Sequence, residues 1–247
     1  MFRGVAIKVA IRKYCSSAWS KEFIEFRGMT QPASDDFILH PSFYNLNEQK
    51  VLLASSLRKL DSLGSREARR SRRQFALRRM AQDQIGQPIN SLFLPDEFYG
   101  FEKGHFDGVI RNYRETHVSS WNEEDWPTVS SILDRLKVIM PEGKTQTHLL
   151  HLGTDGDILP HIDNLEASGS WILGVSLGAE RILRMENENV TFDVLLPSGS
   201  VYLQRGTFRI SYKHSILRNS TFRGRVLNGG QRVSIMIRDI REEHQCL

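Results

Sequence analysis

The sequence predicts an all-β core with flanking helices, folded as a double-stranded β-helix, or jelly roll. After residue 147 the chain contains about eight short apolar segments separated by turns rich in Gly, Pro, Ser and Asp, a spacing typical of this fold. Polar residues that could form one buried site fall on the same segments. A simple β-sandwich without a site is the alternative. The predicted strands are 147–152, 158–163, 171–177, 180–186, 190–196, 201–205, 208–217 and 232–240.

Length and composition indicate one globular domain, which we expect at 35–240 of the 247 residues. It divides into an N-terminal helical extension at 35–146, packed on the core, and a jelly-roll catalytic core at 147–247. The only two cysteines, Cys15 and Cys246, lie near opposite ends of the chain, which argues against a disulfide framework. No apolar run approaches the ~20 residues that cross a bilayer. The net charge of +4 arises partly from the N-terminus and is a poor indicator of nucleic-acid binding.

Residues 1–34 have the pattern of a mitochondrial transit peptide. Five basic residues precede the first acid, Glu22, and alternate with apolar residues that can form one face of an amphipathic helix. The sequence therefore predicts a mitochondrial protein of the matrix, with a frayed basic N-terminus as the alternative. The basic residues are Arg3, Lys8, Arg12, Lys13 and Lys21.

The extension is predicted to begin with a short strand at 37–39 and a helix. Asn45 and Glu48 have the spacing of a capping box, and the helix continues to about Leu63 before Gly64 ends it. Four leucines fall on one side of this helix: Leu46, Leu53, Leu57 and Leu60.

An arginine-rich run follows at 66–79 and could be helical. It holds seven arginines and one glutamate. Clustered arginine is typical of phosphate binding, whereas a solvated, partly disordered insert is the alternative. The arginines are Arg66, Arg69, Arg70, Arg72, Arg73, Arg78 and Arg79.

A further helix is predicted from Asp125 to about Met140. Asp125 is a capping residue, Pro127 suits the first turn, and apolar residues recur at helical spacing until Pro141 and Gly143. We expect this helix to pack against the sheet.

Two copies of the pattern His-X-Asp are candidates for a metal site. They are His105 with Asp107 and His161 with Asp163. In a strand, residues two apart project from the same face, ~6.5–7 Å apart. With His214 as third ligand, the second copy gives the 2-His-1-carboxylate triad that holds non-haem Fe(II) and leaves positions open. The first copy lies outside the strand-rich half, so a structural role is favoured for it.

The last predicted strand places two arginines on one face. Guanidinium binds a carboxylate through two parallel hydrogen bonds, so this face could anchor a dicarboxylate co-substrate. An edge strand with an exposed arginine face is the alternative. One face has Val233, Ile235 and Ile237, and the other has Arg232, Ser234, Met236 and Arg238.

Several stretches together resemble one known family. They are Pro-His-Ile-Asp at 160–163, Gly-Ser-Val-Tyr-Leu-Gln-Arg-Gly at 199–206, Tyr-Lys-His-Ser-Ile-Leu-Arg at 212–218 and the strand at 232–238. Over roughly 36–240 the chain is similar to the AlkB-like Fe(II)/2-oxoglutarate dioxygenases, most closely to a mitochondrial member. The family pattern Arg-X-Asn-X-Thr-X-Arg has Ser234 and Met236 in its middle here.

The resemblance implies a role for each matching residue. His161, Asp163 and His214 would bind iron. Arg232 would pair with the distal carboxylate of 2-oxoglutarate and Tyr202 would donate a hydrogen bond to it. Arg238 would hold the far end of the site. A further histidine, His148, either points into the same cavity or is a core histidine.

From the triad and the resemblance we expect an oxidoreductase that uses Fe(II), 2-oxoglutarate and O2, oxidises a C–H bond and releases succinate and CO2. The expected substrate is a protein side chain or a small molecule, since 93–144 lacks an array of aromatic and basic residues to clasp a flipped base. An RNA N-demethylase acting on mitochondrial tRNA is one alternative, and a binding module whose metal site has lapsed is another. We expect a monomer.

Overall fold

The fold is built on one large antiparallel sheet. The computed structural model describes residues 22–28, 36–80, 88–165 and 169–240. In chain order the strands of this part are β1 (Ile24–Phe26), β2 (Phe37–His40), β3 (Glu102–Gly104), β4 (Ile110–Val118), β5 (Thr145–His161), β6 (Trp171–Gly178), β7 (Arg181–Glu186), β8 (Thr191–Leu196), β9 (Val201–Arg205), β10 (Lys213–Ile216), β11 (Ser220–Phe222), β12 (Arg225–Leu227) and β13 (Arg232–Asp239).

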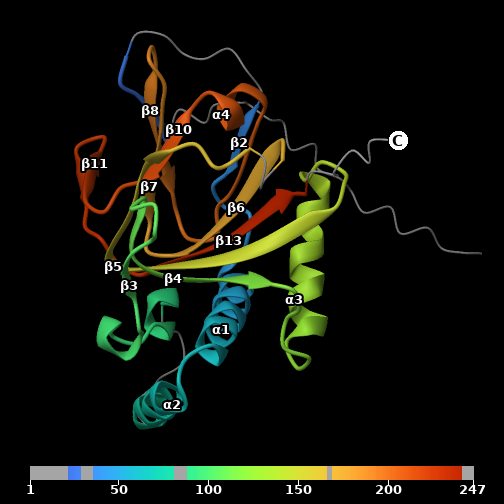
Figure 1. The fold of residues 1–247 in the computed structure, drawn as a ribbon, viewed down its shortest axis with the longest axis vertical. Helices are drawn as coiled ribbons and strands as arrows, with labels where there is room; N and C mark the ends of the chain where they lie inside the picture. Colours follow the sequence, from blue (N-terminus) through green and yellow to red (C-terminus); the bar gives the residue numbers. More distant parts are fainter. Residues whose placement is uncertain (1–21, 29–35, 81–87, 166–168, 241–247) are drawn as a thin grey trace, which may run out of the picture.

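The sheet curls on itself around β5. Among the described residues, eleven strands join it in the order β1-β8-β7-β10-β5-β13-β6-β9-β2, with β3 and β4 attached beside β5. Strands β10, β7 and β8 fold over towards β13, β6 and β9, so that the sheet has an inner and an outer face (Figure 1). This architecture confirms the predicted jelly roll.

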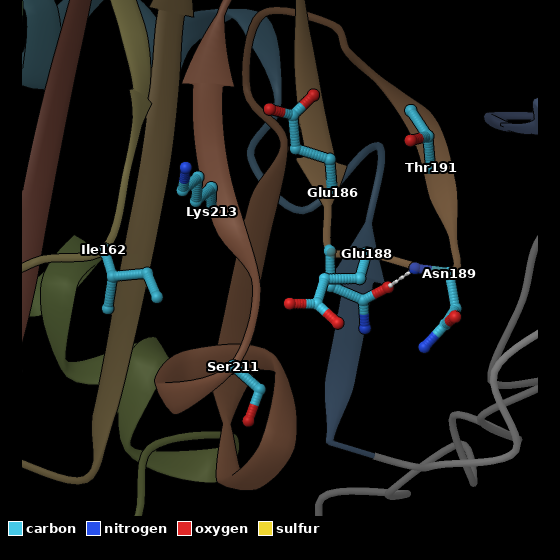
Figure 2. Close-up of a pocket in the computed structure, with 8 residues that line it drawn as sticks. Ile162, Glu186, Glu188, Asn189, Thr191, Ser211 and Lys213 are labelled. Atoms are coloured by element: carbon cyan, nitrogen blue, oxygen red, sulfur yellow. Dashed lines mark hydrogen bonds between the residues drawn. The ribbon is translucent and has the colours of Figure 1, made fainter.

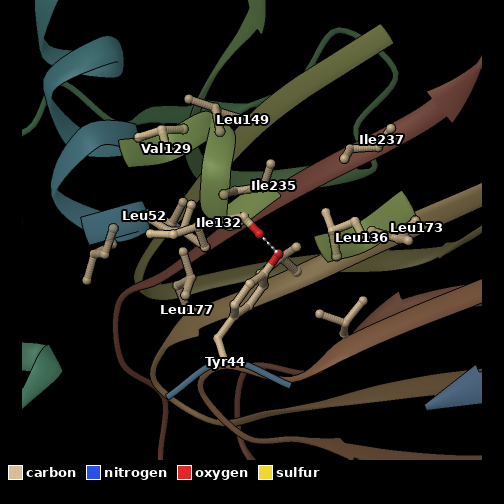
Figure 3. Packing of buried hydrophobic residues seen from close by; sticks show 14 of the residues in the cluster. Tyr44, Leu52, Val129, Ile132, Leu136, Leu149, Leu173, Leu177, Ile235 and Ile237 are labelled. Carbon is tan, nitrogen blue, oxygen red and sulfur yellow. Dashed lines mark hydrogen bonds between the residues drawn. The ribbon is translucent and has the colours of Figure 1, made fainter. Parts of the chain in front are cut away.

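Two of the helices cover the outer face of the sheet. The helices are α1 (Leu46–Ser62), α2 (Arg66–Met80), α3 (Trp126–Leu133) and α4 (Gly206–Ile210), with short 3-10 helices η1 (Ile89–Leu92), η2 (Asp96–Phe98) and η3 (Asp134–Val138). Helices α1 and α3 pack through Leu52 and Val129 against Leu149 and Ile235 of the sheet (Figure 3). None of the helices in the described part of the chain is long and apolar enough to cross a membrane.

A second apolar cluster fills the inner face. It includes Leu150 and Leu152 of β5, Phe192 of β8 and Tyr202 of β9. Residues of β5 therefore alternate between the two clusters, as expected for a strand buried on both faces.

Both predicted helices of the extension are present, with differences in detail. The capping box is confirmed, since Asn45 Oδ1 accepts from the amide of Glu48 at 3.0 Å and Glu48 Oε2 accepts from the amide of Asn45 at 2.9 Å. Leu46 is exposed rather than buried, because it begins the first turn. The helix after Asp125 ends as an α-helix at Leu133 and continues as η3. Asp125 makes no side-chain cap and binds Arg58 instead.

Two strand predictions were right in part, with wrong boundaries. The segments 147–152 and 158–163 belong to one strand, β5, which ends at His161. The segment 208–217 begins as helix α4 and only becomes strand β10 at Lys213. Gly206 has a φ of +50°, which turns the chain out of β9. The side chains of Phe208 and Tyr212, four residues apart, then pack with ring centroids 4.8 Å apart, a helical spacing.

Strands from the N-terminal part join the same sheet. β2 pairs with β9, and β4 pairs with β5. β1 pairs with β8, and its Ile24 is buried in the inner cluster. The stretch 1–34, expected as a leader, thus contains one strand of the sheet, whereas residues 1–21 lie outside the described residues.

Candidate metal centre

The fold brings His161, Asp163 and His214 together. β5 and β10 are antiparallel neighbours, and their pairing sets His161 directly opposite His214. One ligand atom from each of the three side chains lies within 4.8 Å of the other two. His161 Nε2 is 2.9 Å and His214 Nε2 is 3.6 Å from Asp163 Oδ1. These are two imidazoles and one carboxylate that converge on one point from two strands and the loop after β5.

The protonation of these groups suits a cation. Burial lowers the pKa of His214 to about 4, so its imidazole is neutral. Burial alone would raise the pKa of Asp163, but the hydrogen bond from His161 and the charges around it hold that pKa far below its usual range. Burial acts to lower the pKa of His161, but the hydrogen bond to Asp163 outweighs this effect, so the pKa is raised. A metal ion would take the place of that proton.

The orientation of His161 also suits a ligand. Its Nδ1 lies 2.9 Å from the carbonyl oxygen of Leu159, and an N–H donated there leaves the Nε2 lone pair for a metal. Neutral imidazole and carboxylate are donors that Fe(II) accepts. The residues present therefore fit the iron expected from the sequence.

Two arginines hold Asp163 in place. Arg238 Nη2 lies 3.1 Å from Asp163 Oδ2, and Arg209 Nη1 donates to the backbone oxygen of Asp163 at 3.2 Å. Arg209, buried in α4, was missed by sequence reasoning because its segment was predicted to be a strand. Together they restrain both the carboxylate and the loop that carries it.

Arg232 is a buried cation on the inner face. Its side chain lies on the same face as Leu152, its partner on β5, and it is 1% exposed. Arg232 Nε donates to Ser176 Oγ at 2.9 Å, and Nη2 lies 3.4 Å from Ser234 Oγ. No Asp or Glu forms an ion pair with it within the described ranges. A buried charge without an opposite charge is costly, which is the arrangement expected of a site that receives an anion.

Tyr202 lies beside this guanidinium. Burial raises the pKa of Tyr202, partly offset by the positive charge of Arg232, so the phenol keeps its proton. Burial lowers the pKa of Arg232, and Tyr202 opposes that shift through its electrostatic interaction and its hydrogen bond with the guanidinium. Arg232, Tyr202 and Arg238 thus reach the inner face, where the triad also lies.

The remaining candidate histidines lie outside the triad. His148 Nε2 is 3.1 Å from Glu115 Oε2, and its ring stacks on His117. His105 Nδ1 is 2.8 Å from Asp107 Oδ1, and its Nε2 is 3.7 Å from Glu115 Oε1. Glu115 therefore lies between the two histidines, a long-range contact that no local pattern signals.

A cavity of about 610 Å³ lies at the end of β7 and the start of β10 (Figure 2). Lys213 and Ile162, sequence neighbours of the three converging residues, line it, together with Glu186 and Glu188 from the end of β7 and the turn after it. Lys213 precedes His214 on β10, so their side chains leave opposite faces of the strand. The cavity therefore lies on the other side of β10 from the side chain of His214, and it is lined by none of the three converging residues.

Comparison with known proteins places this geometry in a family. The chain is 33% identical over 151 residues to a bovine protein (Bos taurus) named alpha-ketoglutarate-dependent dioxygenase alkB homolog 7, mitochondrial, and 30% identical over 149 residues to the mouse protein (Mus musculus) of the same name. Each match covers 58% of this chain and 66% of the relative, slightly less than two thirds of the relative's length.

Solved structures match the chain at lower identity. A Pseudomonas putida prolyl-4-hydroxylase is 12% identical with a TM-score of 0.49, over 84% of this chain and 94% of that one. The family profile described as 2OG-Fe(II) oxygenase superfamily matches residues 38–238, a range that contains the triad and both arginines of β13. The chain belongs to the 2OG-Fe(II) oxygenase superfamily.

Proposed function

We propose that the protein is a Fe(II)- and 2-oxoglutarate-dependent dioxygenase. His161, Asp163 and His214 hold the iron, and Arg232 with Tyr202 binds the distal carboxylate of 2-oxoglutarate. The observation that carries this proposal is the buried guanidinium of Arg232, which lacks a carboxylate partner among the described residues and shares the inner face with the triad.

The residues of the chain position the reactants. Bound Fe(II) supplies the O2 chemistry that converts 2-oxoglutarate to succinate and CO2 and oxidises a C–H bond of the substrate. Arg209 and Arg238 fix Asp163, and the protonated phenol of Tyr202 donates to the co-substrate. The apolar inner cluster excludes water, which strengthens the contact between Arg232 and a carboxylate.

The substrate we propose is a protein side chain or a small molecule. Glu186 and Glu188 line the cavity on the other side of β10 from His214, and their carboxylates would repel a phosphate backbone that approached there. The alternative, N-demethylation of mitochondrial tRNA, is supported by the arginine run at 66–79. A binding module with a lapsed metal site is disfavoured, because all three metal-binding side chains are present and converge.

Turnover of the purified protein tests these functions. We expect 2-oxoglutarate consumption with Fe(II) and its loss in His161→Ala, with His105→Ala as the matched control that retains it. A protein that never converts 2-oxoglutarate would contradict the dioxygenase. Loss of methyl groups from mitochondrial tRNA incubated with the enzyme would replace the proposed substrate class with the alternative.

We propose a monomeric mitochondrial protein of the matrix. The mitochondrial names of the relatives and the basic N-terminus support this location. A leader that ends before Glu22 leaves β1 in the sheet, so we propose this boundary in place of residue 34. Deleting 1–21 should abolish import into isolated mitochondria and leave turnover in vitro unchanged. Import that continues without these residues would contradict the leader.

A further inference from the structure

Helix α2 is attached to the body through one face. Arg72 is buried, and its guanidinium donates to the backbone oxygens of Phe98 and Asp61 at 3.2 and 3.1 Å. The ring of Phe75 packs on Phe98, with centroids 4.3 Å apart. These contacts use one arginine of the run for structure and fix which side of α2 faces outward.

The outward side is a basic stripe. Four exposed arginines, Arg66, Arg69, Arg70 and Arg73, have the spacing i, i+3, i+4 and i+7, which places them on one face of a helix. We call these four residues the arginine stripe. Arg69 also donates to the carbonyl oxygens after α1, whereas the other three form no ion pair within the part of the chain that the structure describes. Glu67 is the only acid of the helix.

Apolar side chains accompany the stripe. Leu77 is 59% exposed and lies eleven residues after Arg66, close to three full turns, so it falls on the same face. Leu63, in the turn before α2, is 63% exposed. A helix face that combines arginine with exposed leucine is typical of attachment to a lipid surface.

We propose that the arginine stripe, with Leu77, docks on an anionic lipid surface. Arginine attracts the phosphate and carboxylate groups of anionic headgroups, and the leucine enters the boundary between headgroups and acyl chains. The chemistry recognised is thus an array of negative headgroups above an apolar layer. The proposal is independent of the reaction at the metal centre.

The structure favours lipid over nucleic acid as the occupant. The one aromatic residue of α2, Phe75, is packed on Phe98 and cannot stack on a base. Figure 1 places α2 at one end of the long axis and β10 with α4, which flank the metal centre, towards the other. An RNA would have to extend along most of the long axis to contact both the stripe and the metal centre, whereas lipid docking leaves that centre accessible.

Flotation of the full chain with vesicles tests the proposal. The vesicles contain phosphatidylcholine with about 30 mol % phosphatidylserine, and phosphatidylcholine alone is the uncharged comparison. The test variant combines Arg66→Gln, Arg70→Gln and Arg73→Gln. A charge-matched control combines Lys103→Gln, Lys137→Gln and Lys144→Gln, three basic residues elsewhere on the surface. The N-terminal basic residues are common to all variants. The difference in vesicle binding between the test variant and the control therefore measures the contribution of the arginine stripe.

We expect the control to bind like the unmodified chain and the stripe variant to bind on the order of 100-fold more weakly, about fivefold for each arginine. A polarity-sensitive label at Gln74→Cys, in a chain with Cys15→Ser and Cys246→Ser, should shift to shorter wavelength with anionic vesicles only. Equal binding by both variants with no shift would overturn the proposal. So would binding of mitochondrial tRNA through the stripe without binding to vesicles.

Discussion

Replacing Arg232 by Met should stabilise the protein without co-substrate and remove its affinity for 2-oxoglutarate. Arg232 is 1% exposed, and its guanidinium bonds the hydroxyls of Ser176, Ser234 and Tyr202 but no carboxylate among the described residues. Exchanging buried charges for apolar side chains is neutral or stabilising by about 1–4 kcal/mol. Because the contacts with these hydroxyls are lost, we expect a stabilisation of only about 1 kcal/mol, which raises Tm by about 2–4 °C for a domain of this size.

The effect on binding has the opposite sign. Breaking a buried charge pair costs about 3–5 kcal/mol, so 2-oxoglutarate should bind on the order of 100- to 5,000-fold more weakly. Calorimetry with 2-oxoglutarate and a redox-inert divalent metal measures this loss, and metal affinity alone should change little. Thermal unfolding with and without 2-oxoglutarate measures the stability change.

Arg181→Met is the matched control. Arg181 is equally buried, at 1% exposure, but its guanidinium donates to backbone oxygens including those of Arg218 and Gly230. Its loss leaves buried carbonyls unpaired, so Tm should fall, while the folded fraction keeps its affinity for 2-oxoglutarate. Affinity within a few fold of normal in Arg232→Met would refute the assignment of the anchor.

Three further outcomes are expected. Asp163→Asn should abolish the increase in Tm caused by Fe(II) under anaerobic conditions, and a retained increase would exclude it as a ligand. Asn45→Ala should lower the free energy of unfolding by about 1 kcal/mol through loss of the cap, measured in urea, whereas no change would contradict the cap's contribution. Burial, with the charge of Arg114, holds the pKa of His151 well below 6.5. The unfolded chain therefore takes up a proton as pH falls below about 6.5, and stability should fall by up to ~1.4 kcal/mol per pH unit. His151→Gln should remove this part of the slope, and an identical slope would contradict the assignment.

Local patterns predicted much of the fold and of the site. The capping box of α1 depends on residues three apart, and the alternation along β13 depends on a period of two. Both appear in the structure because a short stretch contains all the information. The pairing of His161 with His214 was anticipated from residue type and family resemblance, since spacing alone does not bring two distant strands together.

The errors have physical causes. Helix α4 was missed because Phe208 and Tyr212 pack together only after Gly206 has turned the chain out of β9. β1 was assigned to the leader because basic and apolar residues mix on both sides of Glu22. The contacts of Arg209 and Glu115 join segments far apart in the chain. The periodicity of residues within one segment cannot predict such contacts.

The length of β5 has a consequence for how this enzyme family can vary. Leu152 of β5 pairs with Arg232 of β13, and His161 of β5 pairs with His214 of β10. The number of residues between these two points therefore determines where the proposed co-substrate anchor stands relative to the proposed metal site. Deleting one residue there would move His161 by about 3.3 Å and turn its side chain to the opposite face. Insertions and deletions should thus be tolerated in the turn between β7 and β8 but eliminated from 153–160, in natural relatives and in redesigned enzymes alike.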